Sequence, residues 1–335
     1  MMMVKSECLG VLLVLTLCPW GMTSTRQDIV PVNVPERRIV ITIDDLPGAV
    51  PGSDRAVGKL HDLQSGNHHI LEALQKHNVP ALGLVIESKL QVHGERDARA
   101  AILDQWIANN MELGNHTYSH THFSDLSLQQ FEDDTIKGDT VTRSLLAAQG
   151  KSERYFRYPA LDRGRSPESR STFEHFLKDH GYQIAPVSIE NADYQFNDVL
   201  ADARTHHASH VATETKSLYL KHTEAMLDYV ESSSRMLFGR EVPQVLLIHD
   251  NELNAELLDT LLTMLEHRGY HFIRLEEALS DPAYGSRAEF KGNLESCDLC
   301  WDNRLAAIGK KPIHSPEPPG WVTTTFHEIR TRIGG

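Results

Sequence analysis

Short apolar runs alternate with amphipathic segments along most of the chain. Five runs of hydrophobic or β-branched residues have the length of buried strands, and two shorter runs resemble them. They lie at residues 39–43, 81–86, 182–189, 244–249 and 270–273, with the shorter ones at 111–115 and 154–157. Continuous apolar runs are typical of strands that are covered on both faces. We therefore predict seven strands in a buried sheet.

Apolar residues at helical spacing occupy the intervals between these runs. Residues 60–76 have the clearest pattern, with apolar side chains at Leu60, Leu63, Ile70, Leu71 and Leu74. Similar patterns cover residues 98–110, 128–148, 172–180 and 255–268, and Gly150 and Gly181 stand where helix C-caps are expected. Strands that alternate with helices imply parallel βαβ units. A closed or nearly closed α/β barrel is the natural packing for seven of them.

The two ends of the chain differ from this central region. Lys5 precedes an apolar run at residues 9–18, and small or polar residues follow it, which is the order of a secretory signal. The run is too short to be a stable bilayer anchor. We therefore predict a signal peptide at residues 1–24, a linker at 25–37, and export to the periplasm or the extracellular space. A C-terminal extension richer in Pro and Gly is expected at 285–335.

Removal of this signal would leave two of the four cysteines, Cys297 and Cys300. A structural zinc site needs four ligands at suitable spacing, and the histidines that follow are too distant to complete a familiar pattern. We interpret the pair as a local disulfide or two free thiols.

Composition and charge narrow the range of functions. The chain has 335 residues, of which 40% are hydrophobic and 24% charged, as in an ordinary globular protein with a sizeable core. Its formal net charge is −13. This charge argues against a nucleic-acid partner or an anionic membrane, because both require a basic protein surface.

Two adjacent acids, Asp44 and Asp45, end the first apolar run. Neighbours on a regular strand point to opposite faces. Pro47 and Gly48 indicate that the strand stops here, so that both carboxylates could turn toward one cleft. Paired buried carboxylates are costly unless a metal or another cation is near. A helix cap or a surface turn is the alternative interpretation.

Three histidines follow the strand candidate at residues 111–115, in the segment GNHTYSHTH at residues 114–122. His116 and His120 are four residues apart, and a helical turn would put them on one face as a clamp for zinc or a similar ion. His122 adds a third imidazole nearby. Two exposed polar histidines are the alternative.

Three more polar residues follow strand candidates, where α/β barrels place their active sites. Arg157 precedes Pro159 and could hold a carboxylate in its ionised form. Asp193 lies just beyond the run at 182–189, and His249 ends the most apolar run of the chain. A structural salt bridge is the alternative for Arg157, and a packed core position is the alternative for His249.

The order of these segments resembles the five motifs of the polysaccharide deacetylase (NodB-homology) family, carbohydrate esterase family four. The segments ITIDD, HTYSH and LLIH match well. Two motifs depart from the family pattern, because Ala160 and Leu161 follow Pro159 in place of an aromatic residue and glycine, and Tyr194 follows Asp193 in place of tryptophan. The resemblance implies a distorted (β/α)7 barrel of parallel strands surrounded by helices, with a catalytic domain at residues 38–284.

The resemblance also implies a role for each motif residue. Asp45, His116 and His120 would bind one divalent metal ion, in the first place zinc, with cobalt and nickel as alternatives. Water bound to that metal would be the nucleophile and Asp44 the general base, with Arg157 orienting Asp44.

The other motifs would serve the leaving group and the substrate. His249 is expected to be the general acid, and Asp193 to hold its ring. The backbone N–H of Ala160 would stabilise the oxyanion. Tyr158 and Tyr194 are expected to contact the substrate.

The implied activity is hydrolytic removal of acetyl groups from an N- or O-acetylated oligo- or polysaccharide, with release of acetate. Chitin-like oligomers, peptidoglycan, acetylated xylan and exported exopolysaccharides all fit this class. One alternative is a hydrolase of another non-peptide C–N bond, although such relatives often lack the histidines found here at 116 and 120. A non-catalytic glycan-binding or structural protein is another alternative, which the presence of Asp44 and His249 disfavours.

Overall fold

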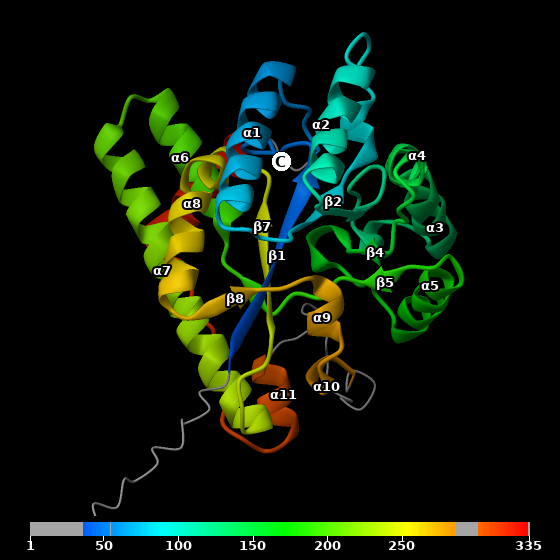
Figure 1. Cartoon of the computed structure of the whole chain (residues 1–335). Helices are drawn as coiled ribbons and strands as arrows, with labels where there is room; N and C mark the ends of the chain where they lie inside the picture. The colour runs from blue at the N-terminus through cyan, green and yellow to red at the C-terminus, as the bar shows by residue number, and fades with distance from the viewer. Residues whose placement is uncertain (1–35, 54, 286–300, 334–335) are drawn as a thin grey trace, which may run out of the picture. The chain divides into compact units, whose positions relative to one another are not determined.

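A parallel β-sheet forms the centre of the fold, with helices packed around it (Figure 1). The computed structural model describes residues 36–53, 55–285 and 301–333. Strand β1 (Arg37–Leu46) lies in the middle of this sheet and is buried from Ile39 onward. It pairs with β7 (Gln244–His249) on one side and with β2 (Leu82–Val85) on the other. The most apolar runs of the sequence therefore become the central strands.

The sheet contains eight strands among the described residues, all in parallel pairs. Its order is β5-β4-β3-β2-β1-β7-β6, and β8 pairs with the first residues of β1. The remaining strands are β3 (Glu112–Asn115), β4 (Tyr155–Phe156), β5 (Gln183–Ile184), β6 (Ile189–Glu190) and β8 (Tyr270–Phe272). This arrangement confirms the predicted α/β barrel of parallel strands surrounded by helices, in the form of a curled half-barrel.

The run at 182–189 forms two strands, where one was predicted. Its first part is β5, at one edge of the sheet, and its last part is β6, at the opposite edge. Residues 185–188 connect the two, and β5 and β6 do not pair with each other. The barrel is therefore open on this side.

Most predicted helices are present with shifted ends. The helices are α1 (Leu60–Lys76), α2 (Arg96–Ala108), α3 (Leu128–Lys137), α4 (Thr140–Ala148), α5 (Pro167–Asp179), α6 (Asp193–Thr205), α7 (Ser209–Phe238), α8 (Glu252–His267), α9 (Leu275–Leu279), α10 (Pro282–Gly285), α11 (Trp301–Ala307) and α12 (Gly320–Ile333). The predicted helix at 128–148 is two helices, because the chain turns at Gly138, which is the C-cap residue of α3. Both Gly150 and Gly181 have positive φ just after a helix, as a C-cap requires.

Alternation along β1 separates two packing layers. Ile39, Ile41 and Ile43 belong to the main core, which they share with α1, α7 and α8 on the outside of the sheet. Val40 belongs to a smaller core with residues of α9 and α10. Since successive side chains on a strand point to opposite faces, Thr42 and Asp44 lie on the same side as Val40. The strand therefore directs Asp44 toward the concave side of the sheet.

The C-terminal region contributes helices that pack against the rest of the fold. α11 contacts α7, and α12 contacts α6. Val322, Phe326 and Ile329 form the buried stripe of α12 and belong to the main core. The predicted signal peptide, most of the predicted linker, and Cys297 and Cys300 lie outside the described residues. Within the described ranges, no helix combines the length and the apolar character needed to cross a bilayer.

Candidate metal centre and active site

The adjacent carboxylates Asp44 and Asp45 both reach one cavity at the C-terminal end of β1. Asp44 lies on the concave face by strand alternation, and it pairs in register with His249 of β7. Asp45 would point away on a regular strand. Instead the pairing with β2 shifts register between Ile43 and Leu46, and Asp45 has a φ of 72°. This bulge turns the second carboxylate toward the first, as bulges beside active sites do.

His116 and His120 lie in an irregular loop after β3, so the expected helical turn is wrong. Thr117 and His120 both have left-handed backbones, with φ of 64° and 55°. The Thr117 amide donates to the side chain of Asn115 at 2.7 Å, and the His120 amide donates to the Thr117 hydroxyl at 3.1 Å. These local bonds hold a conformation that non-glycine residues seldom adopt. They bring the two imidazoles to a centroid distance of 4.9 Å.

Glycine at position 138 allows this loop to approach the C-terminus of α3. A Cβ atom at Gly138 would lie 2.4 Å from the carbonyl carbon of Thr117 and 2.5 Å from the amide nitrogen of Tyr118. Both distances are far below a normal contact. The position of the histidine loop therefore depends on the missing side chain at Gly138.

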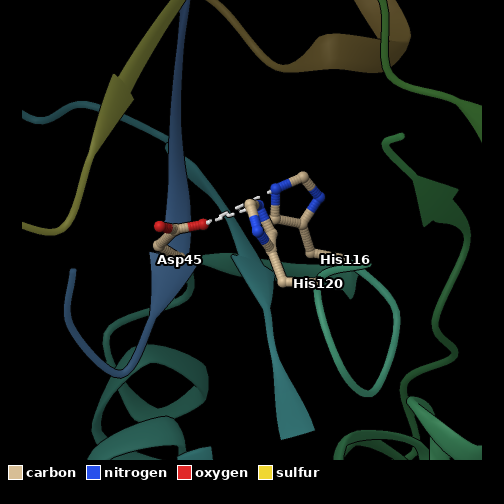
Figure 2. A group of neighbouring side chains, drawn as sticks. All are labelled: Asp45, His116 and His120. Carbon is tan, nitrogen blue, oxygen red and sulfur yellow. Dashed lines mark ion pairs between the residues drawn. The ribbon is translucent and has the colours of Figure 1, made fainter. Parts of the chain in front are cut away.

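Asp45, His116 and His120 point toward one another and form a group that fits a metal ion (Figure 2). Asp45 Oδ1 lies 3.6 Å from His116 Nε2 and 3.4 Å from His120 Nε2. Two ligands that are each 2.0–2.1 Å from a tetrahedral zinc are roughly 3.4 Å apart. Asp45 Oδ1 is buried, and no described residue donates a hydrogen bond to it. One carboxylate and two imidazoles are a suitable donor set for zinc and for similar ions.

The backbone fixes the orientation of His116. Its Nδ1 lies 2.9 Å from the carbonyl oxygen of Arg157, which can only accept a hydrogen bond. The proton is therefore on Nδ1, and Nε2 presents its lone pair toward Asp45. Burial lowers the pKa of His116 although Asp44 and Asp45 oppose this shift. Both effects favour the neutral imidazole that a metal requires.

A buried lysine also contacts Asp45. Lys89 lies in the short 3₁₀ helix η1 (Glu87–Leu90), and its Nζ is 3.7 Å from Asp45 Oδ2 and donates to the carbonyl of Gly48 at 3.0 Å. Burial opposes ionisation of Asp45, but Lys89 and the nearby histidines hold its pKa below the ordinary value. Burial raises the pKa of neighbouring Asp250 to about 7 in spite of the same lysine. No sequence motif pointed to Lys89.

Arg157 forms hydrogen bonds both with Asp44, the candidate general base, and with backbone carbonyls at the open side of the sheet. Its Nη1 donates to Asp44 Oδ1 at 2.6 Å and to Thr42 Oγ1 at 2.7 Å. Nε and Nη2 donate to the carbonyls of Ala185 and Pro186 at 3.2 and 3.3 Å. These carbonyls belong to the connection that leaves the sheet after β5. Arg157 therefore holds Asp44 and also satisfies backbone groups that lack a strand partner.

Asp193 and His249 form a second buried pair beside the metal group. Asp193 Oδ1 lies 2.7 Å from His249 Nδ1, and Oδ2 accepts from the His249 amide and from Asn251 and Asn254. Burial alone would lower the pKa of His249. Asp193, together with Asp45 and Asp44, instead raises it to about 10. The imidazole is thus held in its protonated form near neutral pH.

The expectation that Tyr158 contacts the substrate is wrong. Its side chain is 1% exposed and belongs to an aromatic cluster outside the cavity. The ring stacks on Phe131 at 6.2 Å and meets Phe156 edge-on at 5.2 Å. In contrast, Ala160 and Tyr194 line the cavity with the metal group. Ala160 has a left-handed backbone, with φ of 50°.

The cavity has a volume of about 540 Å³ and contains residues that the motifs did not indicate. It is lined by Asp44, Asp45, His116, His120, His122 and His249, and also by Val50, Glu190, Asn197, Asp198, Phe326 and Arg330, among others. Glu190 and Asn197 flank the motif around Asp193. Phe326 and Arg330 come from α12, in the C-terminal extension, where no motif was apparent.

A protein-family model matches the N-terminal part of the chain, which contains several of the predicted site residues. The model of the polysaccharide deacetylase family matches residues 32–185, which include Asp44, Asp45, His116, His120 and Arg157. Asp193 and His249 follow the matched region, so their assignment depends on geometry. No curated protein sequence matches the chain significantly.

Several solved structures are similar at low sequence identity. BA3943 from Bacillus anthracis, described as a pseudoenzyme of carbohydrate esterase family four, is 17% identical, with 73% of this chain and 66% of that chain covered and a TM-score of 0.48. The peptidoglycan deacetylase PdaC from Bacillus subtilis is 17% identical, with 77% and 98% covered and a TM-score of 0.49. The polysaccharide deacetylase Bc1974 from Bacillus cereus is 17% identical, with 71% and 91% covered and a TM-score of 0.47.

The match to the family model agrees with the motifs around the two carboxylates, the histidine loop and the arginine. Residues 32–185 therefore match the polysaccharide deacetylase family, the family that the sequence motifs resemble.

Proposed function

We propose that this chain is an exported, metal-dependent hydrolase that removes acetyl groups from N- or O-acetylated carbohydrates and releases acetate. The observation that carries the proposal is the buried group of Asp45, His116 and His120 beside two further acid–base pairs. Amide or ester hydrolysis needs an activated water, a base and an acid. Each of these requirements has a separate set of side chains in the cavity.

Asp45 Oδ1, His116 Nε2 and His120 Nε2 would hold the metal ion. A divalent ion bound there, with zinc the first choice and cobalt or nickel as alternatives, would polarise the acetyl carbonyl and make a coordinated water more acidic. The neutral state of His116 and the ionised state of Asp45 suit this role. Lys89 Nζ lies near the other oxygen of Asp45, so Oδ1 is the oxygen that would hold the ion.

Asp44 acts as the general base. Arg157 binds Asp44 Oδ1, while Oδ2 lies 3.6 Å from His116 Nε2 and faces the metal group. The bond to Arg157 keeps the carboxylate in one orientation. Asp44 Oδ2 is thus in position to accept the proton of the attacking water.

His249 acts as the general acid. When the C–N or C–O bond of the acetyl group breaks, the sugar nitrogen or oxygen leaves with an electron pair and needs a proton. His249 carries that proton because its pKa is raised, and Asp193 directs Nε2 toward the cavity by binding Nδ1. The backbone N–H of Ala160 donates to the oxyanion. Because a backbone group has this role, alanine in place of the family's aromatic residue does not prevent it.

Acetate release by the zinc-reconstituted protein tests the proposal. The panel would contain acetylated chitooligosaccharides, peptidoglycan fragments and acetylated xylooligosaccharides, with Asp44→Asn as the blank. We expect release from at least one substrate and a loss of about 10²- to 10⁴-fold in the blank. Binding of a glycan without acetate release would support a non-catalytic role, and release of ammonia or another amine in place of acetate would indicate a different C–N hydrolase.

A further inference from the structure

The last helix of the chain forms one wall of the proposed active site. Phe326 and Arg330 are four residues apart on α12, and both line the cavity with Asp44, Asp45 and His249. The matched family region ends at residue 185, so these two side chains are outside it. None of the roles described above uses them.

α12 is fixed in place by contacts along its length. Thr323 donates to Gln195 of α6 at 3.2 Å, and Arg330 Nε donates to Asp198 Oδ2 at 2.9 Å. The other oxygen of Asp198 accepts from the amide of Gly52 at 3.0 Å. Asp198 therefore connects α12 to the loop after β1, which forms another part of the cavity wall. A helix held in this way can present a side chain to a substrate in a defined position.

Aromatic contacts lead from α12 to the proposed general acid. The ring of Phe326 meets that of Tyr194 edge-on, with centroids 5.4 Å apart. Tyr194 in turn meets His249 edge-on at 6.0 Å. The guanidinium of Arg330 lies 5.1 Å from the Phe326 centroid and covers that ring. Contacts with both Tyr194 and Arg330 therefore orient Phe326.

The chemistry of deacetylation decides which part of the substrate meets this wall. The proton from His249 goes to the nitrogen or oxygen that leaves, and in an acetylated carbohydrate that atom belongs to the sugar. The sugar ring must therefore lie next to His249, and the acetyl group must lie nearer the metal ligands. Apolar walls with a few placed polar groups are typical of small-molecule sites.

We infer that Phe326 is a substrate-binding residue, which together with Tyr194 holds the sugar ring on the leaving-group side of the scissile bond. Arg330 and Asp198 act as positioning residues for Phe326. The inference rests on the proposed function, since it uses the direction of proton transfer from His249. It assigns the C-terminal extension a part in substrate recognition.

Binding experiments in an inactive background test this role. The probes are tri-N-acetylchitotriose and an acetylated xylotriose, titrated by calorimetry into the zinc-loaded Asp44→Asn protein, which cannot consume them. In that background, Phe326→Ala is expected to weaken binding of the preferred probe about tenfold, the size of one lost aromatic contact. Phe326→Tyr keeps the ring and is expected to restore most of the affinity.

Ile329→Ala provides the matched control. Ile329 is a buried neighbour on the same helix that packs in the main core and does not line the cavity. The substitution Ile329→Ala loosens α12 without removing a cavity residue. Affinity for the probe should therefore remain within about twofold of that of the Asp44→Asn protein. Equal losses for Phe326→Ala and Ile329→Ala, or no loss for Phe326→Ala, would overturn the inference.

The same experiments separate this inference from the proposed activity. Wild-type protein that binds a probe without releasing acetate, while Phe326→Ala weakens binding, would contradict the activity and support the binding role. Acetate release that is unaffected by Phe326→Ala in both KM and kcat would support the activity and contradict the binding role. Absence of binding of either probe to the Asp44→Asn protein would also count against the role of Phe326.

Discussion

Asp193 lies 2.7 Å from Nδ1 of His249 and also accepts a hydrogen bond from the His249 amide. One carboxylate therefore sets the orientation of the ring, its tautomer and its charge. Asn251 and Asn254 bind the second oxygen of Asp193 and keep the carboxylate from rotating. The two residues are 56 positions apart in sequence, and the pair depends on α6 beginning at Asp193 beside the end of β7.

Replacing Asp193 should change the pH dependence of the reaction. Burial would lower the pKa of His249, and Asp193 is the main group that raises it to about 10. In Asp193→Asn the pKa should fall, so the protonated acid is lost at a lower pH and the alkaline limb of kcat/KM moves down. The check is a profile from about pH 6 to about pH 10, with metal content and unfolding midpoint measured alongside. An alkaline limb that stays in place would show that His249 is not the titrating acid.

Removal of a metal ligand should be distinguishable from removal of a nearby histidine. His116→Ala takes away one of the three atoms in the metal group, and we expect zinc affinity to fall by more than about 100-fold. His122→Ala is the control, because His122 lines the same cavity but does not belong to that group. Competition with a chromophoric chelator measures both. Equal zinc affinities for the two variants would contradict the ligand assignment.

Lys89 and the metal should compensate for each other. Both offset the buried charge of Asp45, so Lys89→Met leaves that carboxylate without a lysine partner. The metal-free variant should lose about 3 kcal/mol of unfolding free energy, as expected when one partner of a buried pair is removed. Zinc should then raise the unfolding temperature by more in the variant than in the wild type. Thermal unfolding with zinc and with a chelator gives the comparison, and equal zinc-induced shifts would argue against the pairing.

A single added methyl group at Gly138 should disturb the metal site. The Cβ atom would collide with backbone atoms of Thr117 and Tyr118, which cannot move without displacing the loop that carries His116 and His120. We expect Gly138→Ala to lower zinc affinity although residue 138 contacts no ligand. Gly66→Ala is the control, since Gly66 lies within α1 and its Cβ would meet only Ala255 at 3.9 Å. Unchanged zinc affinity in Gly138→Ala would mean that the loop tolerates the shift.

The strands were the most predictable part of the fold. Apolar runs became strands because both faces of the sheet are covered, which leaves little polar alternation in the sequence. The run at 182–189 shows where this reasoning fails. Its middle residues leave the sheet for the opposite edge, and the apolar pattern is the same whether a strand continues or is interrupted.

Helix α7 was missed because polar residues interrupt its apolar pattern. Thr223 and Ser234 are buried on this helix, and their hydroxyls donate to the carbonyls of Tyr219 and Val230 four residues earlier. The helix thus satisfies both hydroxyl donors, and the same two oxygens accept hydrogen bonds from Asn191 and Gln244 outside the helix. Periodicity of apolar residues alone does not detect them.

The motifs predicted the site residues that stand at the ends of strands. They did not predict the site residues that come from elements far from the motifs in sequence. Asp44 and His249 follow directly from their strands. The left-handed backbone at His120 has no signature in the residue type, and Lys89 and Phe326 become neighbours of the site only through tertiary packing. Tyr158 shows the reverse error. It stands in a motif and was expected to contact the substrate, but its side chain packs in an aromatic cluster and does not line the cavity.

The hydrogen bonds of Arg157 link the chemistry to the opening in the sheet. The same guanidinium binds the base candidate Asp44 and the carbonyls of Ala185 and Pro186, where the chain crosses from one sheet edge to the other. Natural variation at this position is consequently subject to two demands at once. A single substitution of Arg157 should therefore impair folding and turnover together. A screen for protein abundance and a screen for activity should both score position 157 as intolerant.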